Sequence, residues 1–466
     1  MPPILATILT LAGIAWLFRR DFREQPNVTS ALWLPLIWVF IIGSRFPTSW
    51  IEILTGINVG GESVEEGSIV DALCYFALIV GGFRVLNQRR INWHQFLAEN
   101  RWVAFYLGYC LVACLWSDYP FVSVKRWVKL IGQPVMVLVL LTEPNPVESF
   151  TRLMKRFAFL VIPVSVLFIK YYSELGSCYD SWNGQRMNTG ITTDKNALGS
   201  LCFALGLFFV WHGWRVWRWE KSKARRDELL LCAAFLVVIL HLFRMAHSSS
   251  PIGAFLMAMG MMALMGLKWI NHRRLTGYLV VGIIATLIGV WGFHLDELVI
   301  QMLGRNKDLT GRTEIWHYLW GMDFNGFIGV GFESFWLGPR LDYLAGVLPG
   351  LILNQAHNGY LETLIQIGGV GVCLTLAMLL EAYFKAHRAL VAGDYFARYR
   401  LAYLAAFIIY NFTEALFRTT AFPFFLFFLV AINYTVQHSD EPVEAVLVEE
   451  DDGEAGVHKT SNPSHF

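Results

Sequence analysis

Long apolar runs, each close to the thickness of a lipid bilayer, constrain this chain more than any other feature. Of its 466 residues, 55% are hydrophobic and only 16% are charged. A helix needs roughly 17–25 apolar residues to cross a hydrocarbon core. The runs that approach this length are 3–18, 31–45, 68–85, 101–116, 123–141, 154–171, 197–212, 228–246, 251–268, 276–294, 366–383, 401–416 and 420–436. The sequence therefore predicts an all-α, polytopic transmembrane bundle of about 12–13 helices, in which the first run is a helix and not a signal peptide.

The distribution of Lys and Arg between the helices predicts their orientation. If the helices alternate, the basic loops all fall on one side, and the positive-inside rule makes that side cytoplasmic. These basic loops lie at 19–23, 87–93, 214–226, 268–274 and 385–400. The opposite, outer face then carries the two longest polar stretches, 171–196 and 295–365, the second of them between the tenth and eleventh helices.

Two parts of the chain differ in composition. Residues 1–438 form the predicted transmembrane domain, whereas 439–466 hold eight acidic residues and one Lys and are predicted to be a disordered cytoplasmic tail. Six of the seven cysteines fall inside apolar runs, and only Cys178 lies in an outer loop. We therefore expect no intramolecular disulfide and no metal site.

The first outer stretch, "SWNGQRMNTGITTDKNALGS", places Arg186, Lys195 and Asn196 just before a membrane helix. An Arg fork and the free N–H groups of a helix N-terminus both favour an anion, so these residues are possible phosphate contacts. The alternative is that the polar side chains cap the helix and are otherwise solvated.

The second outer stretch contains "LTGRTEIWHYLW", in which Thr310 is a plausible N-cap and Arg312 falls in the first turn of an interfacial helix. Ile315, Trp316, Leu319 and Trp320 would form its apolar stripe. Arg312 could bind an anion there, or could snorkel to the headgroup boundary.

"LILNQAHNGYLETLIQIGGVG" follows, and Asn358 could cap the next membrane helix with His357 at its mouth. A histidine in this place is compatible with general-base catalysis or with a structural role. A third basic cluster, Lys125, Arg126 and Lys129, lies at the outer end of the helix that begins near "YPFVSVKRWVKLIG". Cations at that depth are costly unless they snorkel or meet an anion.

Five motifs, in this order, resemble the bacterial O-antigen ligase family and especially its exopolysaccharide-polymerase branch. They are "VSVKRWVKLIG", "RMNTGITTDKNALG", "LGRNKDLTGRTEIW", "GVGFESFW" and "AHNGYLETLIQIGGVG". The motif-bearing region extends over about 122–388. The resemblance implies a C-type glycosyltransferase fold and an enzyme that moves a glycan from a polyprenyl diphosphate to an acceptor hydroxyl, without a cofactor or a metal.

The resemblance also implies roles for individual residues. Arg312 would contact the lipid diphosphate and His357 would be the base, with Asn358 beside it, while Arg186 would be a second diphosphate contact. The chain departs from the family at "HSSSP", where many members carry a cation after a serine. Ser249 stands at this turn, and the missing charge would come from Arg186, Lys195 or the cluster of Lys125, Arg126 and Lys129.

The predicted function is an exopolysaccharide or O-antigen polymerase of the bacterial inner membrane, with its site facing outward. The expected partners are a polyprenyl diphosphate oligosaccharide, a glycan or lipid acceptor, membrane lipids and other polysaccharide-assembly proteins, but no nucleic acid. An O-antigen ligase is the closest alternative. A lipid-linked glycan transporter is the alternative from another class, and it would place its ionisable residues near the bilayer midplane, whereas here they lie at outer ends.

Overall fold

The computed structural model describes residues 1–57, 68–179, 184–282, 312–348 and 353–434, and these residues are helical apart from one short hairpin and the connecting loops. The acidic tail and Thr310 lie outside them. The first half of the chain contains α1 (Pro3–Arg23), η1 (Ser30–Leu32), α2 (Trp33–Gly43), α3 (Pro47–Thr55), α4 (Ile69–Gln88), α5 (Trp93–Glu99), α6 (Arg101–Val112), η2 (Ala113–Trp116), α7 (Pro120–Leu141), α8 (Pro146–Tyr171) and α9 (Ser173–Gly176). The second half contains β1 (Ser177–Tyr179), β2 (Arg186–Asn188), α10 (Lys195–Trp217), α11 (Lys223–Ala246), α12 (Ser249–Gly266), η3 (His272–Arg274), α15 (Arg312–Gly321), α16 (Pro339–Val347), α17 (Gly359–Val391), α18 (Phe396–Tyr410) and α19 (Phe422–Ala431).

The prediction of an all-α polytopic membrane protein is confirmed. Every predicted run overlaps a helix, and of the run 276–294 only residues 276–282 are described. Six of the described helices are long and apolar enough to cross a membrane, or seven if α2 and α3, which meet at an angle of 77°, form one span. The remaining helices are shorter or more polar: α19, for example, has only ten residues and all of them are buried.

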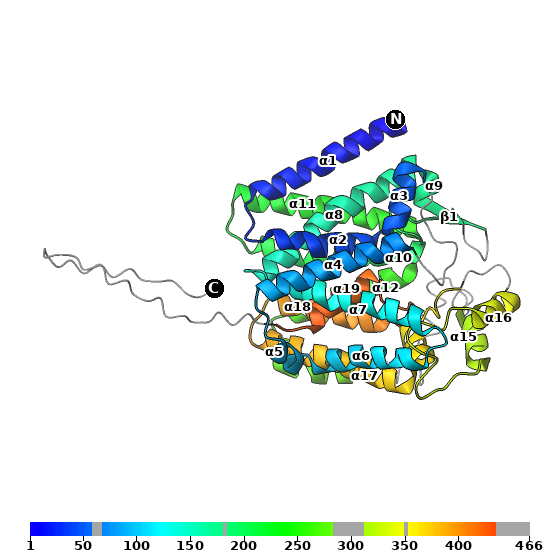
Figure 1. The fold of residues 1–466 in the computed structure, drawn as a ribbon. Coiled ribbons are helices and arrows are strands. Elements are labelled where there is room, and N and C mark those ends of the chain that lie inside the picture. Colours follow the sequence, from blue (N-terminus) through cyan, green and yellow to red (C-terminus); the bar gives the residue numbers. More distant parts are fainter. Residues whose placement is uncertain (58–67, 180–183, 283–311, 349–352, 435–466) are drawn as a thin grey trace, which may run out of the picture. The chain divides into compact units, whose positions relative to one another are not determined.

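Helix α19 lies inside the bundle, where it packs against α7, α17 and α18 (Figure 1). Its sequence, "FPFFLFFLVA", is apolar on every side, as expected of a helix that is surrounded by others and does not face lipid on one side. Elsewhere in the bundle, α10 packs on α11 and α12, and α4 packs on α7. The residues predicted to be catalytic lie at one end of the bundle.

The predicted outer segments gather at that end of the bundle. Figure 1 places α3, β1, α15 and α16 together there, as strict alternation of the helices requires. Helix α10 starts at this end with a defined cap: the Asp194 carboxylate accepts hydrogen bonds from the N–H groups of Asn196 and Ala197, both at 2.9 Å. The capping alternative for the first outer stretch is therefore correct for Asp194.

Helix α17 is broken near its N-terminal end, at Ile367 and Gly368, and the break explains two of the motifs. Gly368 has φ +68°, and a Cβ on it would lie 2.2 Å from the Phe327 carbonyl oxygen. The freed backbone groups pair with the segment 326–331: the N–H groups of Val330 and Gly331 donate to the carbonyls of Ile365 and Gln366, at 3.1 and 2.9 Å. Irregular backbone inside a bundle needs such partners, so "GVGFESFW" and "IQIGGVG" are structurally interdependent.

The second outer stretch has its own small core, built from α15, α16 and the start of α17. Ile315 and Leu319 of α15 are buried in it beside Phe335 and Leu344. Trp320, the fourth residue of the predicted apolar stripe, is 62% exposed and does not contribute to this core.

Candidate active site

The Glu414 carboxylate contacts three of the residues predicted to be functional. It follows α18 in a turn and is only 4% exposed. Arg312 Nη2 donates to Oε1 at 2.6 Å, and His357 Nδ1 lies 3.2 Å from Oε2. Asn196 Nδ2 donates to Oε1 at 2.7 Å. Glu414 thus connects α10, α15 and the start of α17, which are far apart in the sequence.

Helix α15 contacts the residues around Glu414 through two side chains that are one helical turn apart. Arg312 reaches Glu414, and the Trp316 indole donates to the Ala356 carbonyl at 2.8 Å. The Ala356 N–H is also held, because it donates to the Glu362 carboxylate at 2.7 Å. The N–H and the carbonyl of Ala356 are therefore both hydrogen-bonded, and this fixes the backbone just before His357.

His357 has a defined backbone and a defined tautomer. Its φ of +49° is uncommon for a residue with a Cβ, and such conformations persist only where the surroundings enforce them. A carboxylate can only accept, so Nδ1 must carry the proton that is shared with Glu414. In the neutral ring Nε2 then carries a lone pair, and the side chain, 26% exposed, can accept a proton there.

The residues after His357 have structural tasks. Asn358 caps α17, as predicted, by accepting the N–H groups of Tyr360 and Leu361 at 3.0 and 3.1 Å. Gly359 N donates to the Asn411 carbonyl at 2.7 Å, and a Cβ on Gly359 would lie 2.1 Å from Asn411 Oδ1. This close approach of α17 to the end of α18 brings His357 within reach of Glu414.

Asn196 extends the group toward α12. Its side-chain oxygen accepts from Ser248 Oγ at 2.8 Å, while its amide holds Glu414. Ser248 is the N-cap residue of α12, and the predicted Ser249 is the first residue of the helix. The contact with Asn196 is therefore made by the neighbour of the predicted serine.

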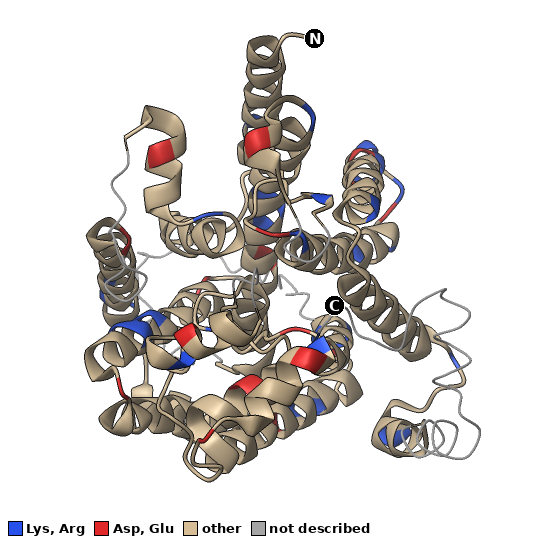
Figure 2. Cartoon of the chain, turned by 90° about the vertical axis from the view of Figure 1, so that its right-hand side faces the viewer, with Lys and Arg blue, Asp and Glu red and all other residues tan. Residues whose placement is uncertain are grey.

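The other predicted cations occupy separate places. Arg186 lies on the β1–β2 hairpin and donates to Ser177 Oγ at 3.0 Å, and Lys195 begins α10 beside Asn196. Figure 2, which looks onto this end, shows Lys and Arg in several groups. Among the described residues, no hydrogen bond or ion pair joins Arg186 to Glu414.

The three cations Lys125, Arg126 and Lys129 make different kinds of contact. Arg126 donates to the Glu333 carbonyl and so fixes the "GFESFW" segment to α7. Lys125 and Lys129 lie over the rings of Phe121 and Tyr75, at 5.0 and 5.1 Å from the ring centres. At least one of the three cations thus has a structural task.

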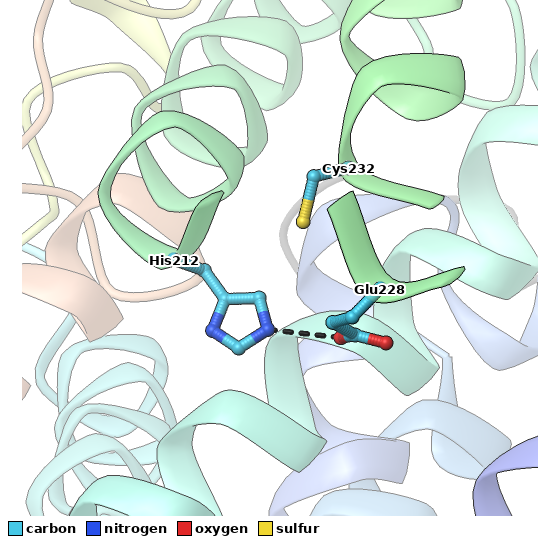
Figure 3. A group of neighbouring side chains, drawn as sticks. All are labelled: His212, Glu228 and Cys232. Atoms are coloured by element: carbon cyan, nitrogen blue, oxygen red, sulfur yellow. Dashed lines mark hydrogen bonds and ion pairs between the residues drawn. The ribbon is translucent and has the colours of Figure 1, made fainter. Parts of the chain in front are cut away.

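One group of side chains resembles a metal-ligand set, at the opposite end of α10. Atoms of His212, Glu228 and Cys232 lie within 4.8 Å of one another (Figure 3). However, the Glu228 carboxylate already accepts from Lys155 at 2.7 Å and from Arg20 at 2.9 Å. A dication there would face two fixed positive charges, so these residues fit an ion-pair network better than a metal.

Glu414 was absent from the residues predicted from sequence. It stands in "YNFTEALFR", at the end of a predicted apolar run, and a carboxylate in a membrane segment is itself an indication of function. That signal was available, but its partners are 57 or more residues away in the sequence.

Comparison with known proteins agrees with the motifs. Residues 233–376 match the O-antigen ligase family. The chain is also 24% identical, over 311 residues, to the exopolysaccharide production protein ExoQ of Rhizobium meliloti; the match covers 64% of this chain and 67% of that protein. The predicted resemblance is confirmed. The family match includes Arg312 and His357 but neither Asn196 nor Glu414.

Proposed function

We propose that this O-antigen ligase-related membrane protein transfers a glycan from a polyprenyl diphosphate to an acceptor hydroxyl, at the outer face of the inner membrane, and that it acts as a polymerase. The observation that carries the proposal is the position of Glu414 between His357 and Arg312. A histidine oriented by a carboxylate is a general base, and an arginine beside it can hold an anionic leaving group.

The reaction would use these residues as follows. His357 Nε2 takes the proton of the acceptor hydroxyl as its oxygen attacks the anomeric carbon. The bond from that carbon to the diphosphate oxygen breaks, and the diphosphate leaves with the electron pair. Arg312 has further N–H donors besides the one given to Glu414, and these would bind the leaving diphosphate.

Glu414 would stabilise the imidazolium that forms on His357, and Asn196 would keep the carboxylate in place. Every step is a proton transfer or a displacement at carbon. The residues present can therefore perform it without a metal or a cofactor.

Polymerase activity is proposed in preference to ligase activity because the cations predicted to contact substrate lie on separate elements: Arg126 on α7, Arg186 on β2 and Arg312 on α15. A polymerase must admit two lipid-linked glycans, each with a diphosphate. The similarity to an exopolysaccharide production protein supports the same choice.

The test is made on purified protein in nanodiscs with a polyprenyl diphosphate oligosaccharide as the only glycan. We expect products of two or more repeats, and their loss in His357→Ala by at least about 100-fold, as for removal of a general base. A transporter would leave the mass of the glycolipid unchanged. Transfer only when a separate lipid acceptor is added would show a ligase.

In cells, deletion of the gene should leave single repeat units on the lipid carrier. Long polymer that remains unattached to its final acceptor in the deletion strain would contradict polymerase activity and favour a ligase.

A further inference from the structure

A cavity of about 560 Å³ lies at the end of the bundle opposite Glu414. It is lined by residues at the ends of α1, α8, α10 and α11. Asn196 is in the first turn of α10 and Arg215 is in the last, so at 1.5 Å per residue the cavity is about 30 Å from the proposed active site. The basic loops predict that this end is cytoplasmic.

The acidic side chains that line the cavity are already paired. Glu228 is held by Lys155 and Arg20, and Glu24 by the same two cations, at 3.7 and 3.6 Å. Glu148 pairs with Arg152 at 3.5 Å. Asp227 pairs with Arg226, at 3.5 Å, outside the lining. The negative charge in the walls is therefore compensated.

Arg215 also lines the cavity, but its charge is not compensated in the same way. Among the described residues no carboxylate lies within 4 Å of it, and its guanidinium stacks on the Trp211 ring at 5.3 Å from the ring centre. A half-buried guanidinium without an acidic partner is costly unless an anion binds to it.

Two further donors face the same space. The cavity is lined by Val147 and Ala224, in the first turns of α8 and α11, where backbone N–H groups favour anions. The cap side chains of these two helices accept from Glu148 and Arg225, and so leave those N–H groups available.

We propose that this cavity binds the phosphate of an anionic phospholipid headgroup, with Arg215 as its principal contact. A lipid is favoured over a soluble phosphate because the site opens at the level of interfacial tryptophans: Trp217 and Trp219 are 64% and 42% exposed. A cationic side chain in a pocket between membrane helices is typical of a headgroup site. The site is independent of the proposed glycosyl transfer.

The experiment measures binding of phosphatidylglycerol to the full-length protein by native mass spectrometry and by the thermal shift in phosphatidylcholine nanodiscs. Arg215→Gln should weaken binding by about fivefold or more, as expected for loss of a charge-assisted contact. Arg218→Gln is the matched control. It removes the same charge from the end of α10, but Arg218 stacks on Trp214 and Tyr395 and does not line the cavity.

Arg215→Lys keeps the charge but loses the planar fork, so this variant should bind the lipid with intermediate affinity. It also serves as the test if Arg215→Gln does not fold. Equal weakening in Arg215→Gln and Arg218→Gln, or no weakening in either Arg215 variant, would overturn the site. Inorganic phosphate is the second probe: if it produces the same Arg215-dependent shift as the lipid, the ligand is a soluble phosphate compound and the lipid assignment fails.

Discussion

Glu414 accepts hydrogen bonds from three separate elements, so its charge and its shape can be tested independently. Glu414→Gln keeps the size of the side chain but removes the charge that would stabilise protonated His357. We expect kcat to fall by about 100-fold or more while KM changes little, as for the loss of a carboxylate that orients a catalytic histidine. The measurement is the steady-state rate of glycan transfer.

Asp342→Asn is the control for this change, because Asp342 is an exposed carboxylate in the first turn of α16. It should leave kcat unaltered. A Glu414→Gln enzyme with the same kcat as this control would show that the carboxylate does not assist His357.

Arg312 tests whether geometry or charge matters at the diphosphate. Arg312→Lys keeps the positive charge but loses the planar fork that matches phosphate oxygens. We expect a fall of about tenfold or more in kcat/KM. Arg340→Lys, at an exposed ion pair with Asp118, is the control. Full activity in Arg312→Lys would reduce the role of Arg312 to that of a point charge.

At the scale of elements, the site depends on how closely α17 approaches α18. Gly359→Ala would place a Cβ 2.1 Å from Asn411 Oδ1. Asn411 is fully buried and its Oδ1 also accepts from Leu416 N, at 3.2 Å, so it cannot move without moving the turn that carries Glu414. We expect the protein to be less stable and the contact between His357 and Glu414 to be lost. The measurements are the unfolding temperature and kcat, and both should fall.

Gly346→Ala provides the comparison, since a Cβ on Gly346, in α16, meets nothing within 4 Å. That change should be neutral or stabilising by roughly 0.5–1 kcal/mol, the usual gain from Gly to Ala in a helix. Equal behaviour of the two variants would mean that the contact at Gly359 is not required.

At the scale of the whole molecule, the orientation in the membrane is a prediction from the basic loops. Cys178 lies on β1, in the first outer stretch, whereas the other cysteines lie in helices. An impermeant thiol reagent should therefore label intact spheroplasts, and the Cys178→Ser variant should not be labelled. Labelling of Cys178 only after lysis would reverse the orientation.

The sequence alone predicted the helices, because membrane-length apolarity and end signals are local properties. It predicted the cap at Asn358 and a helix with Arg312 in its first turn for the same reason. It also predicted Arg312, His357 and Asn196 as functional residues, and these three converge on one carboxylate. It could not separate Arg126, which holds a backbone carbonyl, from its neighbours in the same cluster.

Only the tertiary structure decided which residues meet. Glu414 gains its importance from partners on α10, α15 and at the start of α17, and no local pattern encodes a contact between residues 218 positions apart, as for Asn196 and Glu414. The interdependence of "GVGFESFW" and the broken α17 is likewise a matter of backbone pairing across space. Apolar periodicity determines where a helix forms, because it depends on neighbours in the chain; the position of a buried charge depends on the packing of all the helices around it.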